Sequence, residues 1–161
     1  MVFDEITGIP AHPLVVHAAV VFVPLLCLAA VAYGALPRVR GALGWVAATL
    51  AVVAPLSAWF ATLSGEELER RLVERNYPPE VLAQVERHAE LGTVALYLTL
   101  PLALVTLALV GVCTVAPRRG RPAPRWLTVL LTLAAAGLAA AAAYYTVRTG
   151  DTGARAVWGN L

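Results

Sequence analysis

The sequence predicts an all-α integral membrane protein, an antiparallel four-helix transmembrane bundle with a short helical cap on its outer side. Two observations predict this class. Of the 161 residues, 60% are hydrophobic and 14% are charged, whereas roughly a quarter of a soluble domain is charged. Four apolar runs are each long enough to cross a bilayer, which takes about 20 helical residues. The chain is interpreted as a single four-span membrane domain, residues 1–161, with spans at about 13–36, 42–63, 93–116 and 126–147.

Turn residues and charges end each span in order along the chain. Span one ends before Pro37, and span two begins after Gly41. Span two ends at Ser64, span three before Pro117 and span four before Gly150. Proline and glycine at these positions are typical helix boundaries. Because successive spans are joined by short connections, antiparallel packing of neighbouring helices is expected.

The connection at residues 64–92 is long enough to contain structure of its own. Ser64 followed by Glu67 matches a capping box, which predicts that a helix begins at Ser64. Pro78 and Pro79 end that helix and begin another, because proline suits the first helical turn. We therefore expect two short helices that cap the outer end of the bundle, the second of which runs into span three.

The distribution of charge predicts the orientation of the bundle in the membrane. The connections that follow spans one and three contain arginine and no acidic residue, whereas every Asp and Glu lies at the opposite ends of the spans. Because cytoplasmic loops carry the excess of Lys and Arg, both short connections are expected in the cytoplasm and both chain termini outside it. The arginines of the two connections are Arg38, Arg40, Arg118, Arg119, Arg121 and Arg125.

All three histidines fall on the predicted outer side. His12 and His17 open span one, and His88 lies shortly before span three. His17 and His88 each share a helical face with apolar residues, so both are expected to face the bundle interior. Ionisable side chains at membrane depth suggest function. Haem b in a bundle needs two imidazoles on facing helices. The leading hypothesis is therefore one haem b, ligated by His17 and His88, that serves electron transfer.

Further residues extend this predicted haem site. His12 precedes a proline and is expected at the water boundary, where it orients a propionate or a bound water. Arg87 and Arg155 lie on the same side, and guanidinium groups pair well with propionates. Small residues beside the histidines are expected to leave room for the flat porphyrin. These residues are Ala18, Ala19, Gly92 and Ala95.

Two alternatives to haem remain open. The histidines could make only structural contacts in an accessory membrane subunit without a cofactor. They could also form a transition-metal site with the carboxylates of Glu66, Glu90 or Asp151. The sequence contains no nucleophile elbow, P-loop or dinucleotide-binding motif, and whether the protein is an enzyme stays open. The expected partners are the lipid bilayer and either a redox protein or a quinone, and no nucleic acid; the oligomeric state is not predicted.

Three stretches resemble a known family. PAHPLVVHAAVVFVPL, at residues 10–25, resembles the opening of the bacterial four-span membrane family catalogued as domain of unknown function 2231, which typically begins His-Pro-x-x-Val-His-x-Pro-Ile. RHAELG at 87–92 is similar to the family's second histidine, and TGDTGARAVW at 149–158 to its Gly-rich close. Ala19 stands where the family often has proline, and VWGNL at 157–161 lacks a histidine that many members have. Members occur beside or fused to Rieske or c-type cytochrome modules, so the resemblance implies a redox role.

Overall fold

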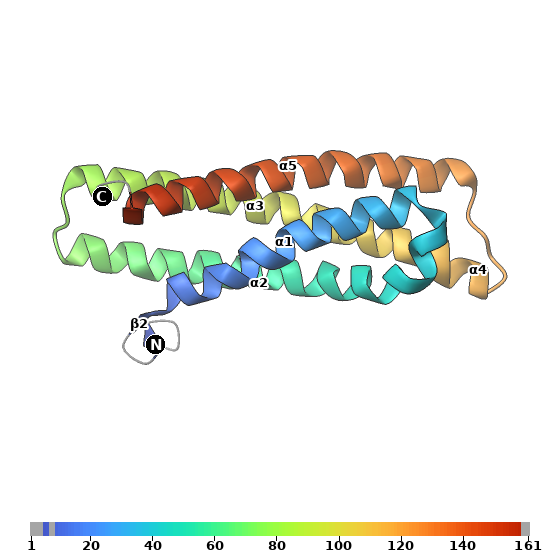
Figure 1. Cartoon of the computed structure of the whole chain (residues 1–161), viewed down its shortest axis with the longest axis horizontal. Helices are drawn as coiled ribbons and strands as arrows, with labels where there is room; N and C mark the ends of the chain where they lie inside the picture. The colour runs from blue at the N-terminus through green and yellow to red at the C-terminus, as the bar shows by residue number, and fades with distance from the viewer. Residues whose placement is uncertain (1–4, 7–8, 159–161) are drawn as a thin grey trace.

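Long helices dominate the computed structural model, which describes residues 5–6 and 9–158 (Figure 1). Among these residues, four helices are long and apolar enough to cross a membrane, which confirms the predicted all-α membrane fold. Two short strands precede them, paired antiparallel with Ile6 opposite Ile9. The elements in order are β1 (Glu5–Ile6), β2 (Ile9–Pro10), α1 (Ala11–Ala35), a 3₁₀ turn (Pro37–Val39), α2 (Arg40–Glu74), α3 (Pro79–Val110), a π-helical turn (Gly111–Val115), α4 (Ala116–Arg118) and α5 (Arg125–Trp158).

The four long helices form a ring in which neighbours run antiparallel. Helix α1 packs against α2 and α5, and α3 packs against the same two helices. Helices α1 and α3 are therefore diagonal partners across the bundle. We call the end where α1 begins and α2 ends the histidine end, and the opposite end, which carries α4, the arginine end (Figure 1). The chain ends themselves, residues 1–4 and 159–161, lie outside the described residues.

Alanines of α2 and α5 pack at the centre of the bundle beside larger side chains of α1 and α3, and many large apolar side chains face outward. Leu28 is 69% exposed and Trp45 is 72% exposed, as expected where lipid is the solvent. Small residues let membrane helices approach closely, and close packing rather than hydrophobicity drives their association. Helices α2 and α5, which both run towards the histidine end, are called the rising helices. Their buried alanines are Ala47, Ala51, Ala54, Ala58 and Ala61 on α2, and Ala135, Ala139 and Ala142 on α5.

Helix α2 passes through Ser64 and Gly65 without interruption, so the prediction that a helix begins at Ser64 is wrong. The Ser64 hydroxyl is buried and donates to the carbonyl of Ala61, one turn back, at 2.9 Å. The chain reverses only after Glu74, and α3 begins at Pro79, where the sequence places the second helix. The first expected cap helix is therefore the continuation of α2, whereas the second runs into the third span as expected, as the beginning of α3.

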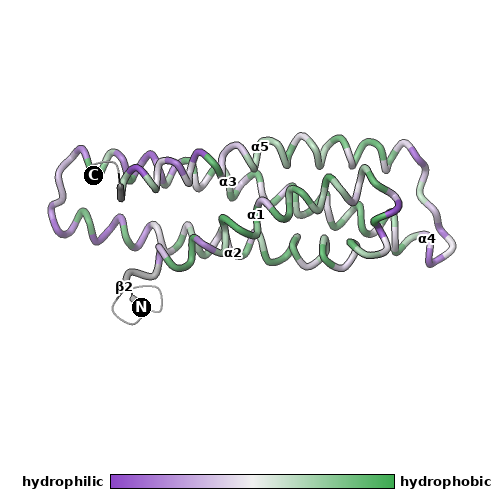
Figure 2. Tube along the Cα trace, in the orientation of Figure 1, coloured by the Kyte–Doolittle hydropathy of each residue, from purple (hydrophilic) through white to green (hydrophobic). Residues whose placement is uncertain are grey.

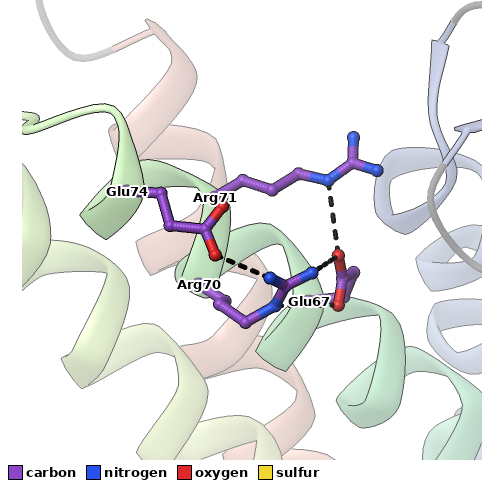
Figure 3. Close-up of polar contacts among 4 residues, drawn as sticks. All are labelled: Glu67, Arg70, Arg71 and Glu74. Atoms are coloured by element: carbon purple, nitrogen blue, oxygen red, sulfur yellow. Dashed lines mark hydrogen bonds and ion pairs between the residues drawn. The ribbon is translucent and has the colours of Figure 1, made fainter.

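These continuations project from the histidine end as polar helices. With 35 residues, α2 is about 50 Å long, which exceeds the roughly 30 Å of a bilayer's hydrocarbon core. Figure 2 shows hydrophilic residues concentrated at this end of α2, α3 and α5. On α2, Arg70 bridges Glu67 and Glu74 at 2.5 and 2.6 Å, and Arg71 reaches Glu67 at 3.4 Å (Figure 3). Such one-turn ion pairs suit a solvated helix surface.

Candidate functional site

His12 and His88 meet at the histidine end, although they lie on the diagonal helices α1 and α3. Their ring centroids are 6.0 Å apart, and the ring planes are inclined at 86°. Both side chains are half-buried. They lie just outside the closed core, because no described residue of α2 beyond Ser64, or of α3 before Leu96, is buried. The pair therefore stands where the tightly packed part of the bundle gives way to the projecting polar helices.

Helix α2 holds the imidazole of His12. The Nδ1 atom of His12 lies 3.1 Å from the carbonyl oxygen of Ala61 and 3.1 Å from the hydroxyl oxygen of Ser64. A carbonyl can only accept, so Nδ1 carries the hydrogen and donates it. Gly65 lets the ring approach the helix, because a Cβ at this position would lie 3.3 Å from His12 Cε1. The continuous helix through Ser64–Gly65 thus forms a seat for His12.

Helix α5 holds the imidazole of His88 in the same way. The Nδ1 atom of His88 lies 3.0 Å from the carbonyl oxygen of Thr149 and 3.2 Å from the hydroxyl oxygen of Thr152. A Cβ at Gly153 would lie 2.9 Å from His88 Cε1, closer than real Cβ atoms come to other heavy atoms. Glycine is therefore required at Gly153 if the His88 ring is to keep this position. The Gly-rich segment that follows span four is the seat for His88.

Both seats leave one nitrogen of each ring available to a ligand. When Nδ1 of a neutral imidazole carries the hydrogen, Nε2 keeps its lone pair. Histidines that bind metals typically donate their other N–H to a backbone carbonyl, which fixes the tautomer and the orientation of the ring. Burial disfavours the charged form of both rings, and positive charges on His12 and His88 would in addition repel each other across 6.0 Å, so neutral rings are favoured. The pair therefore combines the protonation state and the anchoring that metal ligation needs.

His17 lies away from this pair, and the prediction that it faces the bundle interior is wrong. Its side chain is exposed, and its Nδ1 donates to the carbonyl of Pro13 on its own helix at 2.5 Å. Val20 and Val21, on the same face, are 48% and 52% exposed. Because the surrounding solvent is apolar, an apolar face marks contact with lipid as readily as contact with the bundle. The structure does not bring His17 and His88 together.

One of the four small residues that were expected to leave room for a porphyrin packs against a neighbouring helix. Gly92 was expected to leave room for the porphyrin, but it lies against α5. A Cβ at Gly92 would be 3.6 Å from Thr149 Cγ2, an ordinary van der Waals contact. The small residue at Gly92 serves close packing of α3 on α5, as the buried alanines of α2 and α5 do elsewhere in the bundle.

The charged residues of the predicted site are exposed. Arg155 donates from Nε to Asp151 Oδ1 at 3.1 Å, one turn away on α5. Arg87, next to His88 in sequence, is exposed as well. In the part of the chain that the structure describes, no group of three or more His, Cys, Asp or Glu side chains is placed to hold a metal ion. The alternative of a histidine–carboxylate metal site is therefore not assembled among these residues.

Reasoning from sequence missed the residues that seat the two imidazoles. These are Ser64 and Gly65 on α2, and Thr152 and Gly153 on α5. A signal was present, because a hydroxyl residue followed by glycine occurs at the histidine end of both rising helices. The sequence around Ser64 and Gly65 instead matched a helix cap, and the sequence around Thr152 and Gly153 matched the polar end of a helix.

Comparison with known proteins agrees with the sequence resemblance. A family model described as a predicted membrane protein (DUF2231) matches residues 8–160. The match covers nearly all of the chain and includes the histidine-containing opening, His88 and the Gly-rich segment. No curated protein and no solved structure matches the chain.

Proposed function

We propose that this chain, which belongs to the DUF2231 family of predicted membrane proteins, holds one haem b between His12 and His88 for electron transfer. The proposal is supported above all by two imidazoles 6.0 Å apart, each with its Nδ1 hydrogen donated to a backbone carbonyl. Relative to the hypothesis from sequence, His12 replaces His17 as the residue that would hold the iron together with His88.

Haem is the metal group that best suits a site with only two protein ligands. Porphyrin occupies four positions of a six-coordinate iron, and two imidazoles complete it. Zinc, by contrast, takes three or four protein ligands, and the described residues offer no such group. The imidazoles of His12 and His88, whose ring centroids lie 6.0 Å apart, are the residues that would hold the iron.

The side chains that would line a porphyrin lie beyond the histidines, on the projecting parts of α2 and α3. The helix face that carries Ser64 and Gly65 continues through Leu68 and Leu72, and the face that carries His88 continues through Val85. Leu68, Leu72 and Val85 are all half-buried, whereas the same faces deeper in the bundle carry buried side chains, Ala58 and Ala61 on α2 and Leu96 and Thr99 on α3. Apolar side chains that are not fully packed suit the faces of a macrocycle.

The chain's own residues have separable roles in such a site. The carbonyls of Ala61 and Thr149 orient the rings and increase the basicity of Nε2. The exposed guanidinium of Arg87 is available to a propionate, whereas that of Arg155 already pairs with Asp151. Bound iron would supply one-electron chemistry through its ferrous and ferric states. An electron partner, a redox protein or a quinone, would reach the site from the histidine end.

Absorption spectroscopy of the purified protein tests the proposal. Protein from cells well supplied with haem should show a Soret band that shifts on reduction, with one haem per chain. His12→Ala and His88→Ala should each abolish the six-coordinate low-spin spectrum. His17→Ala, on the same helix as His12 but exposed, is the matched control and should retain the spectrum. A colourless wild-type protein, or a spectrum that depends on His17 and not on His12, would refute the proposed ligand pair.

An accessory subunit without a cofactor is the second candidate function. One observation favours it, because the same hydrogen bonds satisfy Nδ1 of both imidazoles without any ligand. In that case the wild-type protein is colourless, and His12→Ala and His88→Ala change only its resistance to unfolding. Differential scanning calorimetry of the haem-free protein in detergent measures that resistance to unfolding and separates this outcome from loss of a cofactor.

A further inference from the structure

The two imidazole seats are built to one plan. In each seat a carbonyl, a hydroxyl three residues later and a glycine one residue after that come from a single helix. In each seat the hydroxyl also donates to the same carbonyl that the imidazole contacts, at 2.9 Å on α2 and 3.0 Å on α5. The seat residues are Ala61, Ser64 and Gly65 on α2, and Thr149, Thr152 and Gly153 on α5.

The correspondence between the two seats extends along α1 and α3, which both run away from the histidine end. Five buried residues of α1 each match a buried residue of α3 that lies as far along the chain from it as His88 lies from His12. Apart from Leu26 and Leu102 the paired side chains differ in type, but their places in the core coincide. The matched buried residues are Val23, Leu26, Cys27, Ala30 and Tyr33 on α1, and Thr99, Leu102, Ala103, Thr106 and Leu109 on α3.

The rising helices α2 and α5 correspond in the same manner. The separation that relates Ser64 to Thr152 also relates three buried alanines of α2 to three buried alanines of α5. The matched residues are Ala47, Ala51 and Ala54 on α2, and Ala135, Ala139 and Ala142 on α5. This separation is larger than that between α1 and α3, because the connection from α3 to α5 contains the π-helical turn, α4 and the residues before Arg125.

The packing of the ring has the symmetry that this correspondence requires. Helix α1 packs on α2 and α3 packs on α5, while α2 also contacts α3 and α5 also contacts α1. A half-turn about the long axis of the bundle exchanges the hairpin α1–α2 with the hairpin α3–α5 and restores the same neighbours. Parallel repeats related by an axis along the membrane normal are a known way of building membrane proteins.

We propose that the chain consists of two copies of one helical hairpin, related by a pseudo-two-fold axis, and that each copy contributes an equivalent imidazole seat to one ligand site on that axis. Ser64 and Thr152 are then positioning residues that act through His12 and His88. Such a site suits a ligand with equivalent coordination positions on two opposite faces, as a metal at the centre of a planar macrocycle has. This statement about the ligand rests on the proposed function, whereas the equivalence of the seats does not.

Glycine substitutions test the seats in protein without any cofactor. Nitrogen-15 NMR of the histidine side chains, assigned by single His→Ala variants, should show Nδ1 protonated and Nε2 unprotonated for His12 and His88. Gly65→Ala should shift the signals of His12, and Gly153→Ala those of His88, because each added methyl meets the ring at 3.3 or 2.9 Å. Gly150→Ala, on α5, meets no atom within 4 Å and should shift neither.

Exchange of the two hydroxyl residues tests their equivalence. The double variant Ser64→Thr with Thr152→Ser keeps a hydroxyl in each seat, so it should retain both histidine tautomers and the affinity for iron protoporphyrin. Ser64→Ala and Thr152→Ala each remove one hydrogen-bond partner of an imidazole. Each should lower that affinity by a similar factor, on the order of fivefold, since a hydrogen bond contributes about that much.

The outcomes separate the two proposals. Protonated Nδ1 atoms and the expected glycine responses in a protein that binds no haem would support the paired seats and refute the haem function. Unchanged His88 signals in Gly153→Ala would overturn the seat on α5. The equivalence of the hairpins would be overturned if the Ser64→Thr, Thr152→Ser exchange variant lost either histidine tautomer. It would also be overturned if only one of Ser64→Ala and Thr152→Ala changed the signals of its histidine, whether or not haem binds.

Discussion

The contact between α1 and α5 near the arginine end allows one substitution to be predicted in detail. A Cβ added at Gly34 would lie 2.8 Å from Thr132 Oγ1 and 2.9 Å from Thr132 Cγ2. Thr132 cannot move freely, because its hydroxyl donates to the carbonyl of Thr128 at 2.7 Å. Overpacking of a closely packed interior costs about 1–3 kcal/mol. Gly34→Ala should therefore destabilise the bundle by about that amount, although alanine is the better helix former.

Equilibrium unfolding in mixed micelles, with increasing dodecyl sulfate, measures this cost. Gly137→Ala, on α5, is the matched control, because Gly137 is exposed and its added methyl meets no atom within 4 Å. This control should gain up to about 1 kcal/mol from helix propensity. Removing the obstructing side chain with Thr132→Ala should rescue Gly34→Ala, which gives a coupling free energy in a double-mutant cycle. Equal effects at Gly34 and Gly137, or no coupling to Thr132, would refute the close approach of α1 and α5.

Two further predictions concern orientation and the end of α1. Reporter fusions after Arg40 and Arg121 should report the cytoplasm, and a fusion after Glu74 should report the outside, because the arginine loops contain no acidic residue; an inverted result at any two positions would reverse the orientation. Arg40→Ala should cost about 1–2 kcal/mol in the same unfolding assay, since its guanidinium donates to two carbonyls at the end of α1 at 3.0 and 2.8 Å. Arg38→Ala, which removes an exposed side chain, should stay within about 0.5 kcal/mol of wild type, and equal costs for both would show that the Arg40 contacts do not stabilise α1.

The helices themselves could be predicted from sequence because lipid leaves the backbone few choices. A segment of about 20 apolar residues in a bilayer must satisfy its hydrogen bonds internally, so it forms a helix. Proline at Pro79 likewise acts locally, through its fixed φ and missing N–H, and α3 begins there. The collection of all three histidines towards one end of the bundle follows from the alternation of the spans alone.

Ser64 shows where a local signal is overridden. Its spacing to Glu67 is that of a capping box, but a helix that arrives from span two already provides the backbone with partners. The hydroxyl donates back to Ala61, and its oxygen remains available to the ring of His12. This second contact joins residues of different helices, so nothing in the sequence around Ser64 indicates it.

The sequence by itself determined that three histidines gather at one end, and only the tertiary structure decided which of them meet. His12, not His17, reaches His88, because the rotation of α1 about its own axis turns His17 towards the exterior. In water, burial of the apolar face would set that rotation and make it readable from sequence. In lipid both faces of α1 are apolar, so the close packing of α1 against the small side chains of α2 and α5 sets the rotation instead. That packing depends on the shapes of all four helices together, and it exists only in the folded bundle.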